Sequence, residues 1–267
     1  MSHRWSRRQF VHTATGLGAL GLGALEVGAL AQAPPAAVPD WVPLQDPAVV
    51  KEMVTVAHSD VKRVRELLAR QPALANAAID WGFGDWEDAL GAAAHTGRRE
   101  IAEVLLAHGA RMSIYAAAML GYLDVVKAFV AVSPGIQRTL GPHGIPLLQH
   151  AQAGGPASAP VVQYLDSLGD AGLRPPSQAL AAGDRDAVVG RYVFGTGPRD
   201  HFDIDVRNDQ LGIARPEASR RFLIHTGSLV FFPSGVPSVK IAFARDGGQV
   251  TQLTIANPEV YLTARRT

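Results

Sequence analysis

The amino-acid sequence predicts an α+β multidomain fold, in which an α-solenoid of about four repeated helix pairs precedes a small antiparallel β-barrel or curved sheet. Similar helical segments recur between residues 49 and 169, and the spacing of apolar residues becomes strand-like after residue 187. The chain has 267 residues, of which 47% are hydrophobic, and this is enough for two domains with packed cores. We therefore expect a repeat domain over residues 49–169, a linker over 170–187 and a β domain over 188–267.

The first 31 residues have the features of an export signal. Ser6 to His12 read SRRQFVH, and a weakly apolar run of Gly, Ala and Leu follows, up to a small-residue pattern that ends at Ala31. This segment resembles a twin-arginine signal, which implies a periplasmic or otherwise exported protein. Cleavage after Ala31 is preferred to cleavage after Ala33, where a proline would follow; an uncleaved anchor is the alternative. After cleavage we expect a Pro-rich tether over residues 32–48 and no stable membrane insertion.

Four segments of the next region align, and each has two apolar runs at helical spacing around a turn residue. When the four segments are aligned, the turn residues that share one position are Asp60, Gly97, Gly121 and Gly154. Seven residues further on, the aligned position is apolar in all four segments, with Leu67, Val104, Ala128 and Val161. Units of this kind stack on one another, because a single unit cannot bury its apolar face alone. Each unit is therefore predicted to be a helix, a tight turn and a second helix.

Two of these segments resemble the ankyrin repeat. Glu87 to Ala110 read EDALGAAAHTGRREIAEVLLAHGA, with the Gly turn, the EIAEVLL helix and the HGA ending of that family. In the fourth segment, GIPLLQHAQAGG is similar to the family's GTPLHLAARNG, with Pro146 and Leu147 in matching positions. The resemblance spans about residues 49–169 and implies an ankyrin-type solenoid whose concave surface binds a folded partner.

Five histidines of this region have different expected roles. His108 lies near a helix C-terminus, where it is expected to bond free carbonyls, and His150 falls in a packed column of the fourth unit. His58 and His95 occupy equivalent positions in two successive repeats, so stacking of the repeats would bring the two side chains close together. A structural role is expected for this pair, and binding of a metal ion is the alternative. His143 lies in an expected exposed loop and is the histidine best placed for a functional role.

The stretch IDWGFGDWED, from Ile79 to Asp88, combines aromatic and acidic residues with glycines. Such aromatic side chains often dominate protein interfaces. The predicted partner surface contains Trp81, Phe83, Asp85, Trp86, His95, Tyr115 and His143. The alternative is that one or two of the aromatic rings pack beneath the loop, and Trp86 is the ring expected to be buried.

The residues that would carry catalysis are missing from the predicted repeats. The chain lacks cysteine, which excludes thiolate metal sites and cysteine nucleophiles. No H-E-x-x-H pattern occurs, and the S-x-x-K match from Ser59 to Lys62 lacks the partner motifs of serine acyl enzymes. A net charge of +1 argues against nucleic acid as a partner. We therefore predict no catalytic residues, no metal site, no cofactor and no enzymatic activity.

The C-terminal region has the alternating pattern of half-buried strands in FDIDV, SVKIAFA and VTQLTI. The stretches VVGRYVFG and RDGGQVTQLTI resemble the small β-domain appended to exported serine beta-lactamase-like proteins. The catalytic domain of that family has no counterpart in this sequence, so the resemblance implies a small β module without an active site.

These features predict a non-catalytic periplasmic scaffold protein that binds another protein, whose identity the sequence does not indicate. The alternative is a small-molecule or metal-binding protein, with its site in the β domain or at the junction near His143 and His150. An unrecognised hydrolase is a third possibility.

Overall fold

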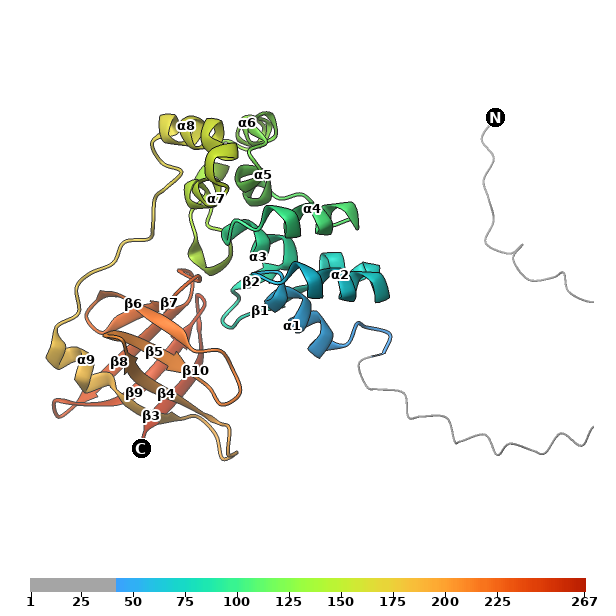
Figure 1. Ribbon diagram of the computed structural model, residues 1–267. Coiled ribbons are helices and arrows are strands. Elements are labelled where there is room, and N and C mark those ends of the chain that lie inside the picture. Colours follow the sequence, from blue (N-terminus) through green and yellow to red (C-terminus); the bar gives the residue numbers. More distant parts are fainter. Residues whose placement is uncertain (1–41) are drawn as a thin grey trace, which may run out of the picture. The chain divides into compact units, whose positions relative to one another are not determined.

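The computed structural model describes residues 42–267, which contain paired helices followed by a β-barrel (Figure 1). The predicted signal peptide over residues 1–31 and most of the tether over residues 32–48 lie outside the described residues. Within the described range, no helix combines the length and the apolar character needed to span a membrane.

Eight of the helices follow one another as four pairs. They are α1 (Pro47–Val56) and α2 (Val61–Arg70), α3 (Ala89–His95) and α4 (Arg99–Ala107), α5 (Ile114–Leu120) and α6 (Leu123–Val132), and α7 (Leu147–Ala153) and α8 (Ala159–Leu168). Short 3-10 helices connect them: η1 (Pro72–Asn76), η2 (Ile136–Arg138), η3 (Pro142–Gly144) and η4 (Gly155–Ser158). A hairpin of β1 (Ala78–Asp80) and β2 (Trp86–Asp88) lies between the first and second pairs.

Side chains that cap the helices explain where several of them begin. Asp60 accepts a hydrogen bond from the backbone N–H of Arg63 at 2.9 Å, at the start of α2. Asp88 accepts one from the N–H of Gly91 at the start of α3, and Ser113 does the same at the start of α5. These caps satisfy backbone donors that have no partner within the first helical turn.

The expected ankyrin-type solenoid is wrong: the described chain folds into nine helices and a closed barrel. In a solenoid each repeat contacts only its neighbours. Here α7 of the fourth pair contacts α3 of the second pair, and a Cβ at Gly97 would overlap the carbonyl of Ala153. The connections also differ: in the described residues a two-stranded hairpin precedes the second pair, and a single antiparallel bridge between Leu140 and Pro146 precedes the fourth.

Small side chains explain this departure from a regular repeat. The helices α3, α5 and α7 contact one another, and their interfaces are rich in fully buried alanines, which include Ala92, Ala93, Ala94, Ala116, Ala117, Ala118 and Ala151. Helix axes approach more closely where the side chains between them are small. The apolar spacing of the sequence specifies helix pairs, but it does not specify that each pair contacts only the next.

The C-terminal strands close into a barrel, which was one of the two predicted forms of the β domain. The helix α9 (Ala182–Val188) precedes β3 (Gly190–Val193), β4 (His201–Arg207), β5 (Gln210–Ala214), β6 (Arg221–Gly227), β7 (Val230–Pro233), β8 (Lys240–Asp246), β9 (Gln249–Ala256) and β10 (Val260–Arg266). Each strand pairs antiparallel with the next, and β10 pairs with β3 (Figure 1). Closure leaves no unpaired sheet edge.

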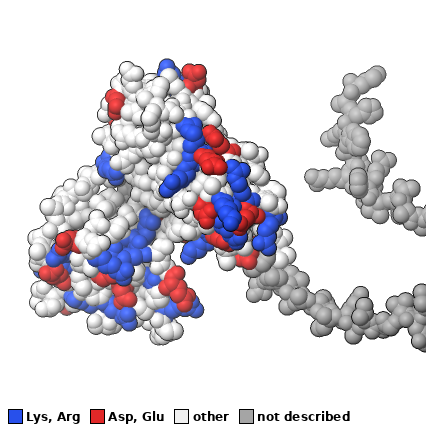
Figure 2. Space-filling model, in the orientation of Figure 1, with Lys and Arg blue, Asp and Glu red and all other residues white. Residues whose placement is uncertain are grey.

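The barrel interior is filled by apolar side chains, including Tyr192, Ile204, Phe231, Ile241 and Leu253. The hydroxyl of Tyr192 donates to the carbonyl of Val188, so this buried polar group keeps a partner. On the face shown in Figure 2, basic and acidic side chains are interspersed over the barrel and over the first helix pairs, and many form ion pairs. This mixture differs from the concentrated basic face that binds nucleic acid.

Leu105, in α4, is fully buried in the core of the helical region. We expect Leu105→Ala to lower the free energy of unfolding by about 2–5 kcal/mol, because truncation removes apolar contacts and leaves a cavity. Urea denaturation measures this change, and Val132→Ala is the control because Val132 is 81% exposed. Equal stabilities of the two variants would contradict the packing described above.

Candidate metal centre

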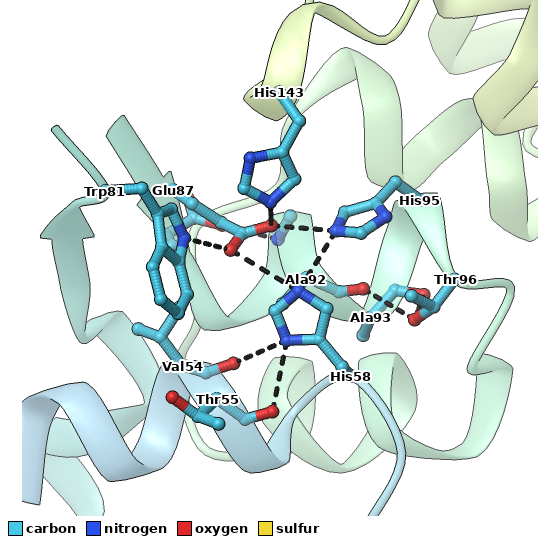
Figure 3. Close-up of polar contacts among 12 residues, drawn as sticks. Val54, Thr55, His58, Trp81, Glu87, Ala92, Ala93, His95, Thr96 and His143 are labelled. Carbon is cyan, nitrogen blue, oxygen red and sulfur yellow. Dashed lines mark hydrogen bonds and ion pairs between the residues drawn. The ribbon is translucent and has the colours of Figure 1, made fainter. Parts of the chain in front are cut away.

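Four side chains of the helical region converge on one point: His58, Glu87, His95 and His143 (Figure 3). One ligand atom from each lies within 4.8 Å of the others. His58 follows α1, Glu87 is the central residue of β2, His95 ends α3, and His143 lies in η3. The cluster therefore joins the first two helix pairs to the loop before the fourth.

The expected proximity of His58 and His95 is confirmed, because their Nε2 atoms lie 3.2 Å apart. Glu87 Oε1 lies 2.9 Å from His95 Nε2 and 3.3 Å from His143 Nε2, and Glu87 Oε2 lies 3.5 Å from His58 Nε2. Ligand atoms of a tetrahedral zinc ion, with bonds of about 2.0–2.2 Å, stand about 3.3–3.6 Å apart. The four distances given above, which involve both oxygens of Glu87, are close to this spacing, while the full set of one ligand atom per residue spans up to 4.8 Å.

Hydrogen bonds on the far side of two rings fix their orientation. His58 Nδ1 donates to the carbonyl of Val54 at 3.0 Å, and His143 Nδ1 donates to Asp85 Oδ2 at 2.8 Å. Both acceptors require a proton on Nδ1, so the neutral rings present the lone pair of Nε2 to the cluster. A carboxylate or carbonyl behind a histidine is the usual outer partner of a metal-binding imidazole.

The carboxylate of Glu87 is the buried centre of the cluster, with no exposed side-chain surface. The indole Nε1 of Trp81 donates to Glu87 Oε2 at 2.6 Å, on the other side of the carboxylate from His95 (Figure 3). Burial alone would raise the pKa of Glu87, but hydrogen bonds from His143 and His95 outweigh it and lower the pKa to about 2. Glu87 is therefore ionised and requires a nearby positive charge.

In the absence of a metal, His143 supplies this charge. Burial by itself lowers the pKa of His143, but hydrogen bonds to Asp85 and Glu87 prevail and raise the pKa to about 9. His143 is thus an imidazolium between two carboxylates at neutral pH. A divalent ion at the same point would replace the proton on His143 Nε2, so metal and proton compete for the site.

His150 lies beside the cluster without joining it. Its ring centroid is 6.4 Å from that of His95, and its Nδ1 donates to the carbonyl of Pro146 at 3.1 Å. His150 is fully buried, as predicted, and burial lowers its pKa to about 4, so the ring is neutral. Tyr115 packs against His150 and shares a hydrogen bond with Thr139, so this member of the predicted surface is not part of the cluster.

In the aromatic loop, the stretch from Ile79 to Asp88, the rings that are exposed and the rings that are covered are the reverse of the prediction. Trp86, the ring expected to be buried, is 66% exposed. Trp81 is half-buried and bonded to Glu87, and Phe83 is half-buried with its ring stacked on Phe202 of the barrel at 6.4 Å. Because β-strand side chains alternate between faces, the orientation that buries Glu87 turns Trp86 outward.

The residues of the predicted partner surface thus do not form one surface in the structure. His95 and His143 belong to the cluster, while Asp85, only 3% exposed, lies behind His143. His143 is half-buried in place of the exposed loop position that was expected. Glu87 was missed because its sequence position suggests the start of a repeat, and no local pattern around Trp86, Glu87 and Asp88 indicates that this carboxylate is buried.

Three imidazoles and one carboxylate suit Zn²⁺ and other late first-row divalent ions, which prefer nitrogen ligands more than Mg²⁺ or Ca²⁺ do. Comparison with models of known protein families and with curated proteins gives no match for this sequence. The interpretation of the cluster therefore rests on its geometry and its chemistry.

The raised pKa of His143 predicts how the metal-free protein responds to pH. A histidine whose pKa rises from about 6.5 to about 9 on folding stabilises the fold fully below pH about 6.5, and this contribution disappears as pH rises through about 9. We expect the Tm of chelator-treated protein to fall between pH about 7 and about 9.5, and to fall less in His143→Ala. His108→Ala is the control, because His108 bonds only the carbonyl of Val104. The same decline in all three proteins would contradict the assigned role of His143.

Proposed function

We propose that this protein binds a transition-metal ion, with Zn²⁺ as the best-suited ion, through His58, Glu87, His95 and His143. The observation that carries this proposal is the convergence of three imidazole Nε2 atoms on a buried carboxylate, with two of the rings held from behind by hydrogen-bond acceptors. A metal-binding protein was the alternative considered from the sequence, with its site in the β domain or at the junction near His143 and His150; the proposed site instead lies in the helical region and includes only His143 of these two.

The chemistry of the cluster supports a metal ion over protons alone. One proton, on His143, is enough to balance the charge of Glu87, yet two further imidazoles are also placed within reach. A divalent cation accepts all four ligand atoms at once, and it can bind the Nε2 atoms of both His58 and His95 near their present separation of 3.2 Å. Binding would release the Nε2 proton of His143, and the proton that His95 Nε2 donates to Glu87 would move to Nδ1 of the same ring.

A set of four protein ligands favours a binding or structural role over catalysis. Zinc sites that act in catalysis usually have three protein ligands and leave a fourth position for water or substrate. We therefore propose a non-catalytic metal-binding protein. The twin-arginine-like segment supports its export to the periplasm, since that type of signal is associated with proteins that cross the membrane already folded.

Metal titration of chelator-treated protein tests this proposal. We expect about one equivalent of Zn²⁺ per chain, and saturation to raise the Tm, because a ligand at about 100 times its Kd stabilises the folded state by about 2.7 kcal/mol. Glu87→Gln and His95→Ala should each weaken binding by at least about 100-fold, since loss of an outer partner alone typically costs about 10–100-fold.

His108→Ala is the matched control for this titration, because His108 lies in the same helical region but outside the cluster. It should bind Zn²⁺ as the unmodified protein does. Zinc binding that is equally weak in all variants, or equally tight in them, would reject this site.

A second proposed function, binding of a protein partner, is supported by the exposure of Trp86. This ring is 66% exposed on β2, directly before the buried Glu87, and large exposed aromatic side chains frequently anchor interfaces. The partner surface would then be centred on Trp86, and Trp81 and Phe83 would support it from within the fold.

Substitution of Trp86 tests whether this side chain contributes to partner binding or to the stability of the fold. We expect Trp86→Ala to leave the Tm within a few degrees of the unmodified value, as is usual for a surface change, and to reduce recovery of a partner identified by affinity capture from periplasmic extract. Phe83→Ala should instead lower the Tm, because Phe83 packs against the barrel core. Unchanged binding of the purified partner by Trp86→Ala would reject this surface.

A further inference from the structure

Asp85 connects the metal centre to the barrel. Its Oδ1 accepts a hydrogen bond from the backbone N–H of His143 at 2.8 Å, and its Oδ2 accepts one from His143 Nδ1 at 2.8 Å. The same Oδ2 accepts a third bond from Arg221 Nη2 at 2.5 Å. Arg221 is the first residue of β6, so one carboxylate contacts both a proposed metal ligand and a barrel strand.

Arg221 depends on this carboxylate for its charge balance. Its side chain is buried, and its other hydrogen bond goes to the backbone carbonyl of Ser234. Its Nε has no hydrogen-bond partner among the residues described by the structure. A buried guanidinium that loses its carboxylate is strongly unfavourable, so Arg221 and Asp85 hold each other in place.

The backbone around this ion pair is closely packed on both sides. Gly144 follows His143 and has a φ of +71°, and Gly235 of the barrel has a φ of +93°. A Cβ at Gly144 would lie only 3.1 Å from the Cα of Gly235, so glycine permits the approach of the two loops. Phe83, between Trp81 and Asp85 in the aromatic loop, also packs against the barrel core.

We propose that the barrel forms part of the outer shell of the metal centre, with Arg221 acting as a positioning residue through Asp85 and His143. This inference rests on the metal-binding function proposed above. Asp85 holds the His143 ring through its backbone N–H and Nδ1–H, so that Nε2 points into the cluster, and a metal bound to Nε2 fixes the ring in this same orientation. Metal binding therefore strengthens the contact of the loop with the barrel, and by linkage that contact strengthens metal binding equally.

Zinc affinities of full-length variants test this coupling, with zinc chloride titrated against a chromophoric chelator. Arg221→Met should weaken Zn²⁺ binding by about tenfold, in the range usual for outer-shell changes. Arg221→Lys should restore affinity to within about threefold, because it returns a cation to Asp85. Arg220→Met is the matched control: Arg220 is the adjacent residue but bonds Asp205 on the barrel.

Hydrogen exchange of the unmodified protein gives a second readout that needs no substitution. The amides of Ser234 and Val236, on the barrel loop around Gly235, should exchange several-fold more slowly when Zn²⁺ is bound. Asp85→Asn serves as a second variant where Arg221→Met does not fold, and it too should weaken Zn²⁺ binding about tenfold.

The possible results distinguish the two proposals. Weakening by Arg221→Met with rescue by lysine, together with slower exchange at the barrel loop, supports the coupling. Unchanged zinc affinity in Arg221→Met and Asp85→Asn, or unchanged exchange in the unmodified protein, overturns it and leaves an isolated metal site. Failure of the unmodified protein to bind Zn²⁺ overturns the proposed function itself.

Discussion

The arrangement of the helical region depends on one buried charge, the carboxylate of Glu87. Removing a carboxylate from water is unfavourable unless cations or hydrogen-bond donors surround it. Glu87 receives donors from three different chain segments: Trp81 in the preceding loop, His95 at the end of α3 and His143 in η3. Because these segments meet at one carboxylate, its charge links the β-hairpin, the second helix pair and the loop before the fourth pair.

This constraint extends into the barrel through Asp85. Glu87 and Asp85 belong to the same hairpin segment, and His143 contacts both carboxylates. Arg221 neutralises Asp85 from the barrel side, so positive and negative groups alternate from Glu87 through His143 and Asp85 to Arg221. Buried networks of this kind are stable only when each member keeps its partner. A cation at Glu87 therefore acts on a network that already includes both parts of the described fold.

Local sequence patterns predicted the four helix pairs, the C-terminal strands and the proximity of His58 and His95, because each depends on residue spacing within an element or between similar elements. The β1–β2 hairpin and α9 were not predicted. The contact between α3 and α7 was not predicted, since it involves non-adjacent helix pairs and a close approach of Gly97 to Ala153 that residue spacing does not reveal. His143 and Glu87 come together through that same packing, and no periodic pattern relates them. The exposure of Trp86 follows from the burial of its neighbour Glu87, which the aromatic character of the loop does not reveal.

Zinc X-ray absorption of the loaded protein reports the types of metal ligand without any substitution. We expect about four nitrogen and oxygen ligands at about 2.0–2.1 Å. We also expect outer-shell scattering from about three imidazole rings, for His58, His95 and His143. A shell of about six oxygen ligands, or scattering from at most one imidazole, would contradict the proposed centre.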